Sequence, residues 1–290
     1  MKIQSLSVVV PTKKCINNCK FCVACMLPEE YKNQMDDNLP FYDLYLEDYM
    51  KRLDFARDNG VNTLMLTGNG EPQQNRQFLT YFGIFMRLMK KPFRNIEMQT
   101  SGVLLDDPYL RFLRNHVGVN TISLSLSSLN NEINKEYNGI RDNLAIDIKW
   151  LCGEIKKYDF NLRLSLNMTD FYNSWEVKNI FKYCREELHA DQITFRILYE
   201  SGLGTLQDQW IKEHQCNYQK LQEIVSYVEI TGTPLQKLEY GRTKYSVHEM
   251  STIVDNDCMS KEVKEELKYL ILRPDCKLYS RWDDPSSLIF

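Results

Sequence analysis

The chain has 290 residues, of which 43 % are hydrophobic and 26 % are charged, with a formal net charge of -3 at pH 7. This is the composition of an ordinary soluble enzyme, without the basic surplus that would indicate nucleic acid or an anionic membrane as partner. No apolar run approaches the roughly 20 residues that span a bilayer, and the N-terminus lacks a secretory signal. Nine cysteines in such a chain predict reduced thiols, metal ligands or catalytic groups, and a cytoplasmic location.

Strand-like apolar runs alternate with helical patterns through the first two thirds of the chain. The strands are expected at 6–12, 63–68, 95–101, 121–127, 162–168 and 193–199. Helical patterns lie between them at 44–59, 76–90, 108–116, 144–157 and 174–188. Six strand–helix repeats with short connections predict an α/β fold, a partial (β/α)6 TIM-like barrel of parallel strands. In such a barrel the chemistry lies at the C-terminal ends of the strands.

The pattern changes in the C-terminal part of the chain. A helix is expected at about 218–230, and residues 267–282 resemble a β-hairpin with its turn at Pro274, Asp275 and Cys276. We therefore expect a barrel over residues 1–205 and a C-terminal extension over 206–290. The extension would pack on the barrel and could cover the substrate.

Four cysteines lie within one short segment, PTKKCINNCKFCVACM, at residues 11–26. Cys15, Cys19 and Cys22 have the spacing C-x3-C-x2-C directly after the first predicted strand. Three thiolates can bind three irons of a [4Fe–4S] cluster and leave the fourth iron open for a substrate or cofactor. Cys25 keeps two alternatives open, since four thiolates could also hold an electron-transfer cluster or a structural zinc ion.

This loop, with Phe21 before its last cysteine, resembles the signature of the radical S-adenosylmethionine (radical SAM) enzymes. The second predicted strand ends in LTGNGEP, which is similar to the GGEP motif of that family. In the family, the backbone and the acid of this motif hold the methionine amino group of the cofactor. The resemblance thus nominates Gly68, Asn69, Gly70 and Glu71 for cofactor binding, with Asn69 where the family usually has glycine.

Three further strand ends agree with this resemblance. The end QTSG nominates Thr100 and Ser101 near the cofactor ribose. The segment SLSSLNNEINKEYNGIRD is similar to one in the GTP 3′,8-cyclase group of molybdenum-cofactor biosynthesis, and places Ser125 near the methionine carboxylate. The fifth and sixth strands are similar to the same group and nominate Asn167 and Arg196 as pocket residues. Ordinary polar residues at strand ends are the alternative for the last two.

The resemblance also implies cofactors, partners and a reaction. A [4Fe–4S] cluster on Cys15, Cys19 and Cys22 would bind S-adenosylmethionine through its open iron. An electron from an external low-potential donor, a flavodoxin or a ferredoxin, would release a 5′-deoxyadenosyl radical that takes a hydrogen atom from the substrate.

The substrate class is predicted from weaker features. The first predicted strand begins by residue 6, which we expect to leave no room for an N-terminal peptide-recognition domain. With no basic surplus, this favours a small-molecule or nucleotide-like substrate. The alternatives are a radical SAM maturase of a ribosomal peptide, and a non-catalytic iron–sulfur protein for electron transfer or redox sensing.

The remaining cysteines are candidates for other roles. Cys276 lies in a turn similar to PDGK and is a catalytic candidate as a hydrogen-atom donor, with an ordinary turn residue as the alternative. Cys216, Cys258 and Cys276 could hold a second cluster, although they lack the close pair typical of metal loops. Cys152 and Cys184 lie on apolar helix faces and are expected to be core thiols.

Overall fold

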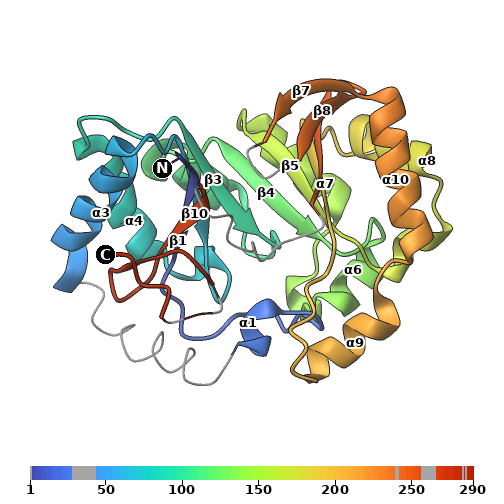
Figure 1. The fold of residues 1–290 in the computed structure, drawn as a ribbon, viewed down its shortest axis with the longest axis horizontal. Coiled ribbons are helices and arrows are strands. Elements are labelled where there is room, and N and C mark those ends of the chain that lie inside the picture. Colours follow the sequence, from blue (N-terminus) through green and yellow to red (C-terminus); the bar gives the residue numbers. More distant parts are fainter. Residues whose placement is uncertain (1, 28–43, 239–241, 256–265, 283, 285) are drawn as a thin grey trace.

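Eleven strands form one continuous curved sheet in the described part of the chain (Figure 1). The computed structural model describes residues 2–27, 44–238, 242–255, 266–282, 284 and 286–290. The strands are β1 (Lys2–Val9), β2 (Thr63–Thr67), β3 (Asn95–Thr100), β4 (Thr121–Leu126), β5 (Asn161–Asn167), β6 (Gln192–Arg196), β7 (Thr233–Lys237), β8 (Thr243–Val247), β9 (Met250–Asp255), β10 (Glu266–Leu272) and β11 (Leu278–Tyr279).

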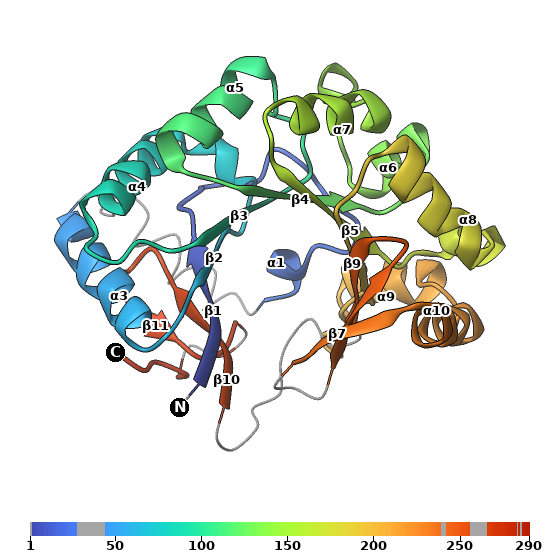
Figure 2. The ribbon, with the colours of Figure 1, turned by 90° about the horizontal axis from the view of Figure 1, so that it is seen from above.

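Helices follow the strands and cover the outer side of the arc (Figure 2). They are α1 (Val23–Met26), α3 (Leu46–Asp58), α4 (Arg76–Leu88), α5 (Asp107–Phe112), α6 (Asn131–Tyr137), α7 (Ile148–Lys157), α8 (Val177–Lys182), α9 (Leu206–His214) and α10 (Tyr218–Thr231). The short helix α1 lies on the inner side of the arc (Figure 2), and α9 packs against it. None of the described helices is long and apolar enough to cross a membrane.

The sheet is an open barrel. Its strand order is β11-β10-β1-β2-β3-β4-β5-β6-β9-β8-β7, so β11 and β7 are the two edges. Strands β1 to β6 pair in parallel with their sequence neighbours. This confirms the predicted α/β partial barrel, and the antiparallel pairing of β10 with β11 confirms the C-terminal hairpin.

Apolar and polar side chains alternate along the strands, so that they lie on opposite faces of the sheet. In β4, Ile122, Leu124 and Leu126 are fully buried in the main hydrophobic core, between the sheet and its helices. Ser123 and Ser125 alternate with them and therefore face the inner side of the arc. This alternation of apolar and polar residues is typical of a strand that is buried on one face. The polar residues line the inner side of the arc, which we call the lumen.

Strands of the C-terminal extension join both ends of the six-strand core. β10 pairs in parallel with β1, and β9 pairs in parallel with β6. The strands β7 to β9, with their antiparallel connections, and helix α9 were not expected from the sequence. The division into a barrel at 1–205 and an extension at 206–290 stays a prediction.

Several element boundaries differ from those expected. The first strand was predicted at 6–12 but spans Lys2–Val9, since Pro11 has no backbone N–H to donate to a sheet ladder. Helix α7 begins only at Ile148, where the side chain of Asp147 accepts a hydrogen bond from the Trp150 N–H and caps the helix. Helix α6 was not expected at all.

Candidate cofactor site

The cysteine loop runs from the end of β1 into α1 on the inner side of the arc (Figure 2). Cys15, Cys19 and Cys22 are half-buried there, and Cys25 in α1 is exposed. The loop thus lies at the C-terminal end of β1, the end at which parallel barrels place their chemistry.

The thiols of this loop influence one another. Burial raises the pKa of Cys15, and burial together with the nearby Cys15 raises the pKa of Cys19 to about 12. A hydrogen bond with Cys25 and burial raise the pKa of Cys22 well above its ordinary value. All three are therefore neutral thiols at neutral pH without a metal, and metal binding has to displace their protons.

A preformed ligand set is not present in the conformation described. Within the described ranges, no group of three or more His, Cys, Asp or Glu side chains is arranged so that it could hold a metal ion. The Cys22 thiol pairs with Cys25, and this hydrogen bond has to open before Cys22 can act as a ligand. The donor set itself, three neighbouring thiols on one loop, fits an iron–sulfur cluster.

The loop after β2 holds the cysteine loop from one side. A Cβ atom on Gly70 would lie 2.8 Å from Thr12 Oγ1 and 3.1 Å from the Cys15 Cα, so only glycine allows this approach. Gln74 donates from Nε2 to the Lys14 carbonyl at 2.8 Å and accepts from the Ile16 N–H at 2.9 Å. Its amide therefore binds the peptide groups on both sides of Cys15.

Glu71 connects the β2 loop to the end of β3. It is buried, and it accepts from Thr100 Oγ1 at 2.7 Å and from the Ser101 N–H at 2.8 Å. Burial raises the pKa of Glu71, although these hydrogen bonds act in the opposite direction. Asn17 of the cysteine loop donates to Ser101 Oγ at 2.7 Å, so the three loops meet at one point.

The end of α6 holds the cysteine loop from the other side. The N–H groups of Asn18 and Lys20 donate to the carbonyls of Gly139 and Tyr137, at 3.3 Å and 3.0 Å. Gly139 has a φ of 54°, and a Cβ atom there would lie 2.2 Å from the Asn18 oxygen. A left-handed backbone with this close contact requires glycine.

The other predicted cofactor residues form a second group on the next three strands. Asn167 at the end of β5 donates to Ser125 Oγ of β4 at 3.1 Å. Arg196 of β6 is paired in register with Asn167. Thr100 pairs in register with Leu124, the residue before Ser125, so this group adjoins the one around Glu71.

Buried polar atoms without partners mark the space between these groups. Thr12 Oγ1, Asn17 Oδ1 and Arg196 Nε are buried and have no hydrogen-bond partner among the described residues. A buried polar atom without a hydrogen-bond partner destabilises the fold unless a ligand or a water molecule binds it. A polar cofactor between the cysteine loop and the strand ends fits these unsatisfied groups.

Comparison with known proteins decides the family. A model described as "Radical SAM superfamily" matches residues 9–189, which contain the cysteine loop and the strands β2 to β5. The chain belongs to the radical SAM superfamily. Members of this superfamily are enzymes that use a [4Fe–4S] cluster and S-adenosylmethionine, as the resemblance implied.

Individual relatives are distant. The chain is 27 % identical over 165 residues to the antilisterial bacteriocin subtilosin biosynthesis protein AlbA of Bacillus subtilis, which is 55 % of this chain and 34 % of AlbA. Among solved structures, native anSMEcpe with bound AdoMet matches at 16 % identity and a TM-score of 0.53, over 79 % of this chain and 59 % of that one. The radical SAM enzyme coproporphyrinogen III oxidase (HemN) of Escherichia coli matches at 14 % identity and a TM-score of 0.50, over 80 % and 54 %. The chain thus spans clearly less than two thirds of the length of these relatives.

The other cysteines that the structure describes have contacts outside the cysteine loop. Cys276 is buried in the turn between β10 and β11 with a φ of 58°, and its thiol points to the Tyr45 carbonyl beside α3. Cys216 is buried and donates to Asn173 Oδ1 at 3.2 Å. Cys258 lies outside the described residues. Cys152 and Cys184 are fully buried core thiols, as predicted.

Sequence reasoning did not nominate the residues that hold the cysteine loop in place. Asn17 connects this loop to Ser101, and Gln74, Tyr137 and Gly139 bind the loop from the β2 loop and the end of α6. Only the Asn-Gly pair at 138–139 carried a local signal, since it is typical of a turn with a left-handed residue.

Proposed function

We propose that this chain cleaves S-adenosylmethionine reductively and uses the resulting radical to take a hydrogen atom from a small-molecule or nucleotide-like substrate. The observation that supports this best is the contact between two motifs. Gly70 lies against the backbone of Cys15, and the backbone of Glu71 forms a hydrogen bond with the Cys15 thiol. A cofactor bound to the loop at 68–71 would therefore lie next to the cysteine thiols.

In this proposal Cys15, Cys19 and Cys22 would hold the cluster, which would supply the electron for cleavage of the sulfonium C5′–S bond. The chain itself positions the cofactor. Gly68 and Gly70 let the β2 loop pack closely against Val10 and the cysteine loop, and Asn69 lies between them. Glu71 already accepts two hydrogen bonds, but a carboxylate has further lone pairs and can still accept an ammonium group.

The second group would receive the other end of the cofactor. Ser125 and Asn167 offer hydroxyl and amide groups, and the buried Arg196 Nε would donate to a carboxylate or to the ribose. Thr100 and Ser101 keep Glu71 in place from β3. An external low-potential donor, a flavodoxin or ferredoxin, is part of the proposal, and so is the cytoplasmic location.

A second candidate substrate is a peptide. It is favoured by the match to AlbA, which by its name takes part in the biosynthesis of a bacteriocin. The match covers 55 % of this chain, so it supports the shared radical SAM core more than a shared substrate. The small-molecule substrate therefore stays the first proposal.

The experiment starts from protein reconstituted with iron and sulfide without oxygen and reduced with dithionite. We expect the EPR signal of the reduced cluster to change when S-adenosylmethionine is added, and 5′-deoxyadenosine to form. A cluster signal that is indifferent to the cofactor, with no 5′-deoxyadenosine, would refute the proposal. It would favour an electron-transfer or redox-sensing protein in which Cys25 is the fourth ligand.

A further inference from the structure

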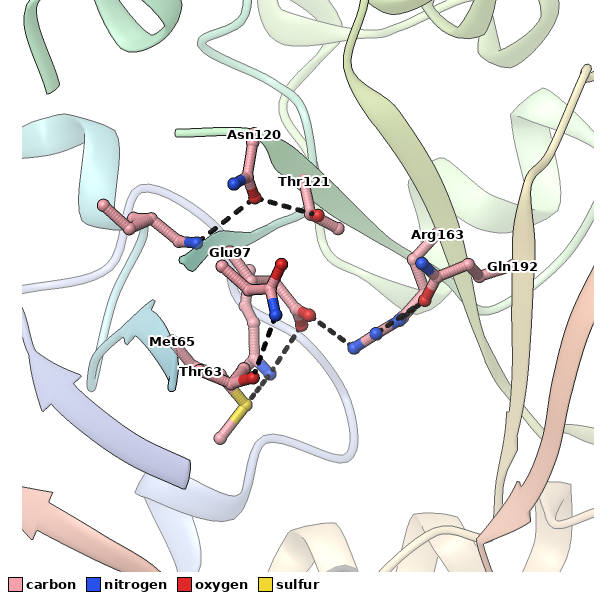
Figure 3. Close-up of polar contacts among 10 residues, drawn as sticks. Thr63, Met65, Glu97, Asn120, Thr121, Arg163 and Gln192 are labelled. Atoms are coloured by element: carbon pink, nitrogen blue, oxygen red, sulfur yellow. Dashed lines mark hydrogen bonds and ion pairs between the residues drawn. The ribbon is translucent and has the colours of Figure 1, made fainter. Parts of the chain in front are cut away.

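A charged cluster lies on the inner face of the sheet, several residues before the ends of β3 and β5 (Figure 3). Arg163 of β5 forms an ion pair with Glu97 of β3, whose side chain is 3 % exposed. On its other side the guanidinium donates from Nε and Nη2 to Gln192 Oε1, at 2.9 Å and 2.6 Å. Figure 3 shows the guanidinium held between the two acceptors.

A second cation faces the same space. Gln192, beside Arg163, pairs in register with Ser251, and Ser251 pairs with Ser246 of β8. Residues opposite one another in a sheet share a face, and side chains two apart on a strand do too, so Lys244 points into the lumen beside Arg163. Burial lowers the pKa of Lys244, and the charge of Arg163 lowers it further.

Arg163, Glu97 and Lys244 together carry one positive charge in excess. Glu97 balances Arg163, and Lys244 has no hydrogen bond or ion pair with any part of the chain that the structure describes. An arginine has five N–H donors and a lysine three. Arg163 uses three in the contacts above, so the two side chains keep five donors for another group. A half-buried ammonium without a partner is costly, and an anion would remove that cost.

We propose that Arg163 and Lys244 bind an anionic group of the substrate, a carboxylate or a phosphate. The proposal rests on the proposed function and specifies its substrate class. Arg163 precedes Asn167 by four residues on β5, or about 13 Å along the strand. A compound of nucleotide size can therefore hold its anionic end at Arg163 and Lys244, while its other end lies near the cofactor residues.

Lys244 is the better position for a test. Removing Arg163 would leave Glu97 buried without its partner, and the protein would be destabilised whatever the lumen binds. Lys244→Met keeps the aliphatic length and removes only the charge. Lys237→Met on the adjacent strand β7 is the matched control, because Lys237 is exposed.

The measurement is calorimetric titration of reconstituted protein with inorganic phosphate and, separately, with succinate, at constant ionic strength set by chloride. We expect saturable binding of at least one probe, weakened about ten- to hundredfold in Lys244→Met and unchanged in Lys237→Met. The probe that binds with the higher affinity shows whether the site prefers a phosphate or a carboxylate. Lys244→Arg, which keeps the charge, should restore binding.

Two results would overturn the proposal: no saturable binding of either probe to the wild type, or equal affinity in the wild type and Lys244→Met. Iron content and thermal unfolding of each variant show whether the fold is intact. The binding assay does not depend on cofactor cleavage. Wild-type protein that binds the probes but forms no 5′-deoxyadenosine would refute the proposed function and leave the anion site standing.

Discussion

Gly139 connects a barrel helix to the cysteine loop, and Gly139→Ala should release that loop without unfolding the barrel. At a φ of 54°, alanine costs about 1–2 kcal/mol in left-handed backbone energy. Its Cβ atom would lie 2.2 Å from the Asn18 oxygen, so the loop has to retreat by roughly 1 Å.

That retreat breaks the hydrogen bonds of Asn18 and Lys20 to the end of α6, at about 1 kcal/mol each. The sum is roughly 3–4 kcal/mol, against a total stability of about 5–15 kcal/mol for a typical folded protein. A local movement of the loop costs less than global unfolding, so the loop should detach first.

The assay compares iron per chain after anaerobic reconstitution with thermal unfolding of the metal-free protein. Gly139→Ala should lose most of its iron and keep a cooperative transition. Gly153→Ala in α7 is the control: a Cβ atom there meets nothing within 4 Å, and a helical alanine should add up to about 1 kcal/mol. A full iron content and an unchanged cluster EPR signal in Gly139→Ala would refute the reasoning.

Three further predictions test other contacts. Cys22→Ala should abolish 5′-deoxyadenosine formation, whereas Cys25→Ala should keep the cluster; loss of the cluster in Cys25→Ala and its retention in Cys15→Ala would overturn the ligand assignment. Gln74→Ala removes both hydrogen bonds around Cys15, so iron should be lost to a ferrous chelator faster than from the wild type, with little change in metal-free stability. Burial alone would raise the pKa of Asp208, but its hydrogen bonds with Ser201 and Thr205 hold that pKa well below the ordinary value. The ionised carboxylate therefore stabilises the folded protein above about pH 4, and this contribution is lost as the pH falls. Asp208→Asn should therefore lower the melting temperature at pH 7 and have a smaller effect near pH 2.

Local patterns in the sequence were enough to predict the core of the fold. The strands β1 to β6 have apolar residues on one face and mostly polar or charged residues on the other, and this alternation depends on each segment alone. The cysteine spacing and the GNGEP segment are likewise local. Their order along the chain placed them on neighbouring loops, and the contact between Gly70 and Cys15 agrees with that.

Features that depend on distant pairing could not be predicted in this way. β10 pairs with β1 from the opposite end of the chain, and a short apolar strand does not show which edge it will join. The same holds for Gln74, which looks like any polar residue of a turn until the fold brings Lys14 and Ile16 beside it. The hydrogen bonds that hold the cysteine loop are therefore visible only in the structure.

The inner face of the sheet carries a functional signal that the motifs at the strand ends do not contain. The interior of a closed TIM barrel is filled with branched apolar side chains, which makes it a packed core. Here the inward positions of β3, β4 and β5 are mostly polar or charged, with Glu97, Ser123 and Arg163 in the middle of their strands. Polar groups in such positions are costly unless they bind one another or a ligand. An inner face of this kind is suited to holding a polar substrate, and Glu97 and Arg163 mark how far below the strand ends that substrate can extend.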